Sequence, residues 1–300
     1  MTRRNTPPIS FIGFGEAGQA IASGLRDTGI DRIAAWDILF PESAGAPLKS
    51  AGERMGVRIA SSASDAVRDT DVIISAVTAA SSVDAAVSVA QHLSGNPYYL
   101  DINSVSPGRK QETAKLLGEC ARYVDVAVIA AIHPARHQTP LLLSGPHAEE
   151  VSPLLRELDM RFSVVGPDLG SAAAIKMIRS VMIKGMEALT FECFLAAARA
   201  GVLEEVTASL KNNYPTIDWT KLADYNLERM ASHGERRAAE MEESAVTLHE
   251  LGLDPLMVAS TVRRQREMGA LGKHEAVRQT LKSGRTAILR AIDNLSKDRH

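Results

Sequence analysis

The chain has 300 residues, 45% of them hydrophobic and 23% charged, so it can bury the core of one large domain or two ordinary ones. Its 34 Lys and Arg nearly balance its 36 Asp and Glu, which argues against nucleic acid or a membrane surface as a partner selected by charge. The longest apolar run, 126–132, is far shorter than the roughly 20 residues of a membrane span. Two cysteines, Cys120 and Cys193, make no disulfide framework and lack metal-ligand spacing. We therefore expect a cytoplasmic protein without a metal site.

Over residues 1–167, short apolar runs alternate with Ala-rich amphipathic stretches. This pattern is typical of βαβ units in a parallel, doubly wound sheet of the Rossmann type. The predicted strands are 9–14, 32–36, 57–60, 71–76, 98–101, 123–129, 141–144 and 162–165. The predicted helices between them are 17–28, 63–68, 82–92, 107–118 and 148–159.

Residues 168–300 have a different pattern, with apolar side chains at helical spacing and no proline between Asp168 and Tyr214. The pattern predicts an all-α domain that begins with a long, mostly buried helix between the domains. Further helices are expected at 203–211, 222–230, 235–251, 255–267 and 274–295. Long apolar helices need more cover than one such domain supplies, so we expect a homodimer.

A glycine-rich turn follows the first predicted strand. Gly13, Gly15 and Gly18 have G-x-G-x-x-G spacing, which permits a tight turn, close approach of a pyrophosphate and close packing of the next helix on the strand. The N–H groups at the start of that helix favour an anion. We therefore expect the turn to bind a dinucleotide through Gly13, Phe14, Gly15, Glu16, Ala17 and Gly18.

Asp37 ends the second predicted strand, 19 residues after Gly18, where a carboxylate can bind the adenosine ribose hydroxyls. A carboxylate would repel a 2′-phosphate and no Arg immediately follows it, so NAD is favoured over NADP as the cofactor. Val77 and Thr78 follow the strand 71–76, where a doubly wound fold lines the cofactor crevice. An ordinary βα loop is the alternative for these two residues.

Three later segments, together with the glycine turn, resemble the β-hydroxyacid dehydrogenase superfamily, which includes 3-hydroxyisobutyrate and 6-phosphogluconate dehydrogenases. Residues 101–107 (DINSVSP) resemble D-x-S-T-x-x-P, 125–131 (DVAVIAA) stand in place of D-A-P-V-S-G-G, and 170–176 (GSAAAIK) resemble G-x-x-x-x-x-K. The segment 189–201 resembles a group with a distinctive C-terminal helical domain. The resemblance implies hydride transfer between NAD(P) and a small 3-hydroxy acid or its carbonyl form.

The resemblance makes Lys176 the catalytic acid/base, and apolar neighbours together with the helix N-terminus would disfavour its charged form. Arg179 and Ser180, three and four residues later, share its helix face and are candidates for binding a small anionic substrate. The family commonly has Asn at the position of Ser180, so the substrate class is open. Arg179 is equally suited to a salt bridge. Asn103 and Ser104, at the end of a predicted strand, are further substrate-binding candidates.

Other polar residues carry weaker signals. Lys184 extends the basic face of the helix, and Glu240 falls where the family has a lysine–aspartate pair, here without the lysine. His133 and His137 are four residues apart, but Pro134 between them argues against a shared metal. His133 and Arg136 remain candidates for a substrate loop.

Two other functions fit the glycine turn. One is an imine or pyrroline-type C=N reductase; imine reductases of this fold usually lack the lysine found here at position 176. The other is a non-catalytic NAD(P)H-binding sensor, in which Lys176 would have no role.

Overall fold

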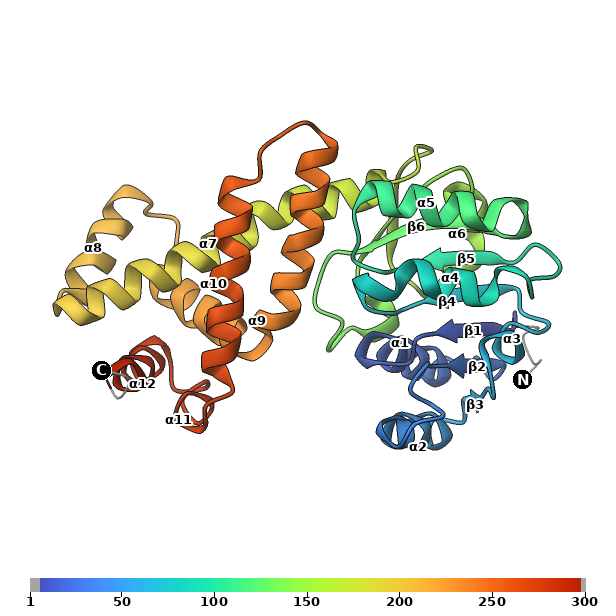
Figure 1. Cartoon of the computed structure of the whole chain (residues 1–300), viewed down its shortest axis with the longest axis horizontal. Helices are drawn as coiled ribbons and strands as arrows, with labels where there is room; N and C mark the ends of the chain where they lie inside the picture. Colours follow the sequence, from blue (N-terminus) through green and yellow to red (C-terminus); the bar gives the residue numbers. More distant parts are fainter. Residues whose placement is uncertain (1–5, 298–300) are drawn as a thin grey trace. The chain divides into compact units, whose positions relative to one another are not determined.

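Eight strands form one sheet in the order β3-β2-β1-β4-β5-β6-β7-β8 (Figure 1). In this computed structural model, which describes residues 6–297, they are β1 (Ile9–Ile12), β2 (Ile33–Trp36), β3 (Arg58–Ile59), β4 (Val72–Ser75), β5 (Tyr98–Asp101), β6 (Arg122–Val128), β7 (Leu141–Ser144) and β8 (Phe162–Gly166). The chain winds outward from β1 in both directions, which confirms the doubly wound, Rossmann-type prediction. The switch point lies between β1 and β4, and ligands of such sheets bind outside the carboxyl ends of the strands there.

Helices cover both faces of the sheet because alternate strand residues point to opposite sides. Phe11 and Ile74 belong to one core, which includes residues of α1 and α6, whereas Ile12 and Ile73 belong to the other, which includes residues of α3, α4 and α5. The helices of this unit are α1 (Glu16–Asp27), α2 (Ala46–Arg54), α3 (Ala63–Ala66), α4 (Ser82–Ala90), α5 (Pro107–Leu117) and α6 (Ala148–Glu157). Of these, α2 was not predicted from the sequence; it is a short helix with little apolar pattern.

One strand runs against the predicted direction. β7 pairs antiparallel with β6, with Asp125 opposite Ser144, while the other strand pairs are parallel. The link between β6 and β7 contains only a 3₁₀ turn (Arg136–Gln138) and no crossover helix, and a parallel pair needs a longer crossover. The expectation of a parallel sheet throughout was therefore wrong at β7.

The chain divides into two compact units after Lys176. Within the described part of the second unit, every regular element is a helix, as the sequence predicted. Its helices are the continuation of α7 (Ser171–Ala200), α8 (Leu203–Asn213), α9 (Trp219–Glu250), α10 (Leu256–Gly272), α11 (Glu275–Arg278) and α12 (Arg285–Lys297). The two helices expected at 222–230 and 235–251 form one helix, α9, because nothing between them breaks the hydrogen-bonding pattern. No helix within residues 6–297 is both long and apolar enough to cross a bilayer.

A buried ion pair joins the helices of the second unit. Arg237 of α9 donates to Glu187 of α7, and Gln265 of α10 donates to the same carboxylate over 2.7 Å. All three side chains are buried. Since a buried charge is tolerated only when it is paired, these contacts hold α7, α9 and α10 in one arrangement.

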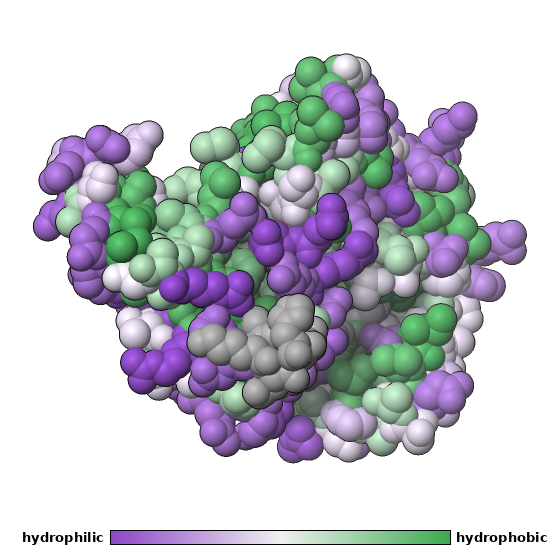
Figure 2. All heavy atoms as spheres, turned by 60° about the vertical axis from the view of Figure 1, so that its left-hand side comes forward, coloured by the Kyte–Doolittle hydropathy of each residue, from purple (hydrophilic) through white to green (hydrophobic). Residues whose placement is uncertain are grey.

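α7 is less buried than the sequence predicted. Met182 and Leu189 are 66% and 60% exposed, and they line a groove of about 590 Å³ between α7 and α10. Met257 of α10, 65% exposed, lies in the same groove. Figure 2 shows green, hydrophobic residues at the surface among purple, hydrophilic ones. The periodicity identified the helix correctly, but part of its apolar side remains uncovered in a single chain.

Candidate functional site

The glycine turn between β1 and α1 is closed by backbone contacts that exclude a side chain. Gly13 has φ +90°, and a Cβ there would lie 2.4 Å from the carbonyl oxygen of Ala76. A Cβ on Gly18 would lie 2.6 Å from the carbonyl oxygen of Gly13. These two glycines therefore allow the tight turn and the close helix packing that the sequence predicted.

Gly15 is in a different environment. It is the N-cap of α1, it supplies no side-chain cap, and a Cβ on it would have no atom within 4 Å. Open space at a helix N-terminus suits an anion, because the N–H groups and the helix dipole both favour negative charge. The turn therefore fits a dinucleotide pyrophosphate. Glu16 is exposed and Ala17 is partly buried in the first turn of the same helix.

Asp37 holds the turn against the end of β2. One carboxylate oxygen accepts from the backbone N–H of Phe14 over 2.7 Å, and the other accepts from Leu39 N–H over 3.0 Å. Each carboxylate oxygen has a second lone pair, so Asp37 retains the capacity to bind ribose hydroxyls. The Phe14 ring is fully buried against Phe11 and Phe40, so Phe14 contributes backbone and core packing.

The loops after β4 and β5 meet beside this turn. Asn103 accepts from Val77 N–H over 2.7 Å and donates to Ser75 Oγ over 3.0 Å. Asn103 is 4% exposed, so its amide serves to join the loops, although the sequence placed it among substrate-binding candidates. Val77 also borders Gly13, whereas Thr78 is exposed and pairs with Ser81.

Lys176 lies in the second turn of α7 and donates from Nζ to Ser104 Oγ. Both side chains are partly buried. Ser104 directly follows Asn103, which contacts Val77, which in turn borders Gly13. The predicted acid/base and the predicted substrate-binding serine are therefore brought together, on the same edge of the sheet as the glycine turn.

Beneath this edge lies a charged cluster that the sequence analysis missed. Lys110 Nζ is 3.1 Å from Asp101 Oδ1 and 3.5 Å from Asp125 Oδ1, and all three side chains are at least 99% buried. Tyr123 donates its hydroxyl to Asp101 over 2.7 Å; burial and the neighbouring Asp101 charge raise the pKa of Tyr123 well above its usual value, so the phenol remains a donor. Asp101 and Asp125 are the first residues of the segments 101–107 and 125–131, which the family resemblance rests on. No local sequence pattern indicated that Lys110 would pair with them.

The remaining substrate-binding candidates belong to the second unit. Arg179 is exposed, whereas Ser180 is 7% exposed and accepts from Lys184 Nζ over 3.1 Å. Lys184 is also buried and lies 2.9 Å from Glu240 of α9. Glu240, which lacks the neighbouring lysine of the family's lysine–aspartate pair, is thus paired with Lys184 of α7.

The two histidines of the β6–β7 loop have different surroundings. His133 is exposed, whereas His137 is buried against Gly24 of α1. Arg136 lies 2.6 Å from Asp27 of α1. The loop is therefore fastened to α1 through His137 and Arg136.

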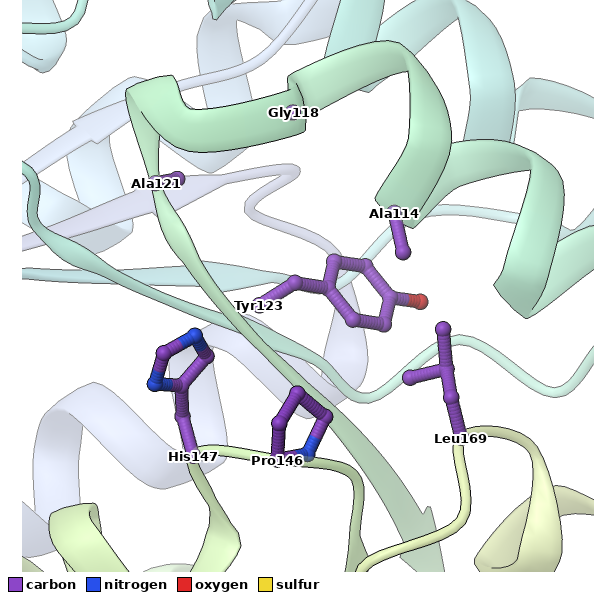
Figure 3. A pocket seen from close by; sticks show the side chains of 7 residues that line it. All are labelled: Ala114, Gly118, Ala121, Tyr123, Pro146, His147 and Leu169. Carbon is purple, nitrogen blue, oxygen red and sulfur yellow. The ribbon is translucent and has the colours of Figure 1, made fainter.

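A small hollow of about 130 Å³ opens beside Tyr123 (Figure 3). Its walls include Ala114 of α5, Leu169 and Pro146, and the imidazole of His147 lies at its side. His147 is engaged with Glu150 over 2.9 Å. At this volume the hollow is too small for a dinucleotide.

The chain is similar to known proteins over most of its length. Residues 8–166 match the NAD binding domain of 6-phosphogluconate dehydrogenase, and residues 197–268 match a domain of unknown function, DUF1932. A conserved hypothetical protein from Sinorhizobium meliloti is 35% identical, with 96% of each chain covered and a TM-score of 0.77. A second conserved protein of unknown function, described as structurally similar to 3-hydroxyacid dehydrogenases, is 30% identical over 88% of this chain and 97% of its own, with a TM-score of 0.71.

More distant structures share the fold. The 3-hydroxyisobutyrate dehydrogenase of Mycobacterium tuberculosis is 16% identical, with 88% of this chain and 94% of that chain covered and a TM-score of 0.70. An imine reductase from Myxococcus stipitatus is 23% identical, with 96% and 99% covered and a TM-score of 0.58. The NAD-binding match and the relatives of 30% identity or more decide the family. The chain belongs to the β-hydroxyacid dehydrogenase superfamily, with an NAD(P)-binding domain followed by a helical domain.

Proposed function

We propose that this protein is an NAD(P)-dependent oxidoreductase that transfers hydride between nicotinamide and a small 3-hydroxy acid, or reduces the corresponding carbonyl acid. The observation that carries the proposal is the hydrogen bond from Lys176 to Ser104, at the sheet edge that also bears the glycine turn. An amine beside a hydroxyl in such a place suits proton transfer to and from a substrate oxygen.

The chain's own residues divide the work. When bound, the nicotinamide cofactor accepts or supplies the hydride. The open space at Gly15 and the N-terminus of α1 hold its pyrophosphate. In the oxidative direction, the neutral amine of Lys176 takes the proton of the substrate hydroxyl and becomes an ammonium; in the reductive direction, the ammonium returns that proton. Ser104 Oγ, which accepts from Lys176, orients the amine and offers its own O–H to the substrate.

NAD is the cofactor we propose, because Asp37 places a carboxylate at the end of β2 and Ile38, 81% exposed, follows it. A 2′-phosphate would meet that carboxylate and an apolar side chain, with no guanidinium to pair it at position 38.

The test combines binding and turnover on one preparation. NADH and NADPH binding is measured by fluorescence titration, and a panel of 3-hydroxy acids is then followed at the nicotinamide absorbance. Lys176→Met should lower kcat by about 100- to 10,000-fold, as expected for loss of a general acid/base, while NADH still binds. Lys221→Met is the control, because that side chain is 86% exposed on α9.

Each other outcome selects a different function. Cofactor binding without turnover on hydroxy acids or imines, in the wild type and the variant alike, would indicate a sensor. Turnover of cyclic imines that survives Lys176→Met would indicate a C=N reductase. Either result would overturn the proposed hydroxy acid activity.

A further inference from the structure

Asp101, Lys110 and Asp125 form a buried cluster of charged side chains next to the candidate site. Asp101, the last residue of β5, and Asp125, in the middle of β6, are register partners, so their carboxylates lie side by side inside the protein. Two adjacent buried carboxylates repel each other, and Lys110 of α5 places its ammonium between them. Its Nζ also donates to the carbonyl oxygens of Asp101 and Val126.

One branch of the cluster reaches the loop that carries Ser104. Asp101 Oδ1 accepts from the backbone N–H of Asn103 over 3.0 Å, one residue before Ser104. Since the amide of Asn103 is itself fastened to Ser75 and Val77, this loop is held from both sides. The position of Ser104 therefore depends on the orientation of the Asp101 carboxylate.

The other branch reaches the first turn of α7. Asp125 Oδ2 accepts from Ala173 N–H over 3.0 Å and from Ser144 Oγ over 2.9 Å, and Ser144 Oγ accepts from Ala172 N–H over 3.0 Å. Ala173 is one helical turn before Lys176. A carboxylate at a helix N-terminus is stabilised by the helix dipole, so this turn also offsets the excess negative charge of the cluster.

We propose that Lys110 is a positioning residue that sets the placement of Ser104 and of Lys176 through the two aspartates it bridges. This inference rests on the proposed function for its catalytic readout, but its geometry is independent of the substrate. The side chain of Lys110 is 1% exposed, so Lys110 acts through the groups that it contacts inside the protein. The cluster contacts both the backbone before Ser104 and the turn before Lys176, so its ammonium couples the two sides of the site.

The first experiment changes Lys110→Met, which keeps the length of the stem and removes the charge. We expect kcat to fall by roughly 10- to 100-fold, the cost of a small misplacement of reacting groups, while the Kd for NADH changes less than about twofold because the glycine turn is untouched. Lys110→Arg should recover part of the loss. The control is Thr70→Val, which removes a buried hydroxyl bonded to Ser10 in the same unit, away from the cluster.

A second readout needs no substrate. Trace acylation with acetic anhydride, quantified by mass spectrometry, compares the reactivity of Lys176 with that of Lys221 at one mildly alkaline pH. Lys110→Met should change the rate of acylation of Lys176 severalfold, because displacement of Ser104 and of the first turn of α7 alters the hydrogen bonding and burial of the Lys176 amine. If the wild type turns over no hydroxy acid, the proposed function fails while this measurement still tests the positioning role.

A milder variant guards against a Lys110→Met protein that does not fold. Ser144→Ala keeps the lysine and both aspartates but removes the hydroxyl that caps Ala172 and contacts Asp125. It should lower kcat and alter Lys176 reactivity in the same direction by a smaller factor. If Lys110→Met or Ser144→Ala lowers the Tm as Thr70→Val does, yet leaves kcat and Lys176 acylation unchanged, the cluster is only structural and the proposal is wrong.

Discussion

Gly15→Ala isolates the anion-binding role of the glycine turn from its role in folding. A Cβ at Gly15 would have no atom within 4 Å, and its φ of −73° is accessible to alanine. Alanine is a poorer N-cap than glycine but also reduces the entropy of the unfolded chain, so stability should change by less than about 1 kcal/mol. In the proposed complex, the added methyl fills the space through which a phosphate oxygen would approach the N–H groups of α1.

Loss of one charge-assisted hydrogen bond is worth about 1.5–3 kcal/mol, which corresponds to a roughly 10- to 150-fold weaker Kd. NADH titration by fluorescence or calorimetry measures this, with thermal unfolding of the free protein in parallel. The contrasting variant is Gly13→Ala, which must adopt φ +90° and would place its Cβ 2.4 Å from Ala76 O, so its free protein should lose stability by several kcal/mol. If Gly15→Ala binds NADH within twofold of wild type, the pyrophosphate does not lie on this turn.

Three further predictions concern cofactor choice, pH and assembly. Ile38→Arg combined with Asp37→Ser should shift the ratio of NADPH to NADH affinity at least tenfold towards NADPH, by pairing the 2′-phosphate; an unchanged ratio in the same titration would contradict the assigned ribose site. Burial lowers the pKa of His137, so the stability that this residue contributes is fully present above its unfolded-state pKa, near 6.5, and is lost as the pH falls through its folded-state pKa. The free energy of unfolding, measured with urea from pH 8 to 5, should therefore fall less steeply for His137→Gln than for the wild type. Parallel pH dependences of the two proteins would refute this. We also propose that a second copy of this chain covers the groove between α7 and α10, which is lined by apolar side chains and by charges of both signs. Leu189→Glu should yield monomers in sedimentation velocity, whereas the control Val87→Glu should not. A monomeric wild type would exclude the dimer.

Local chain geometry explains what could be predicted. The strands of the sheet follow from short apolar runs, and the flanking helices α1, α3, α4, α5 and α6 follow from amphipathic stretches between them, both set by neighbouring residues. The spacing of Gly13, Gly15 and Gly18 likewise predicted a turn whose three glycines have the three expected environments. These features depend on residues within a few positions of one another, so they are readable without knowledge of the remainder of the fold.

The amide of Asn103 shows why neighbouring polar residues could not be told apart. Asn103 and Ser104 are adjacent and equally polar, and both were predicted to bind substrate. The fold turns Asn103 inward onto Ser75 and Val77, and leaves Ser104 to receive Lys176 from 72 residues away. Which of the two faces the site depends on how the loops after β4 and β5 meet, and no local pattern encodes that.

The sequence by itself therefore determined the doubly wound N-terminal sheet, the all-α second half, the glycine turn and the family resemblance that singles out Lys176. Only the tertiary structure decided the direction of β7, the uncovered side of α7 and the Asp101–Lys110–Asp125 cluster. Hydrophobic periodicity reports that a segment is a strand but not which way its neighbour runs. Lys110 meets its aspartate partners only when α5 has packed on the sheet, and these three residues come from segments far apart in the sequence.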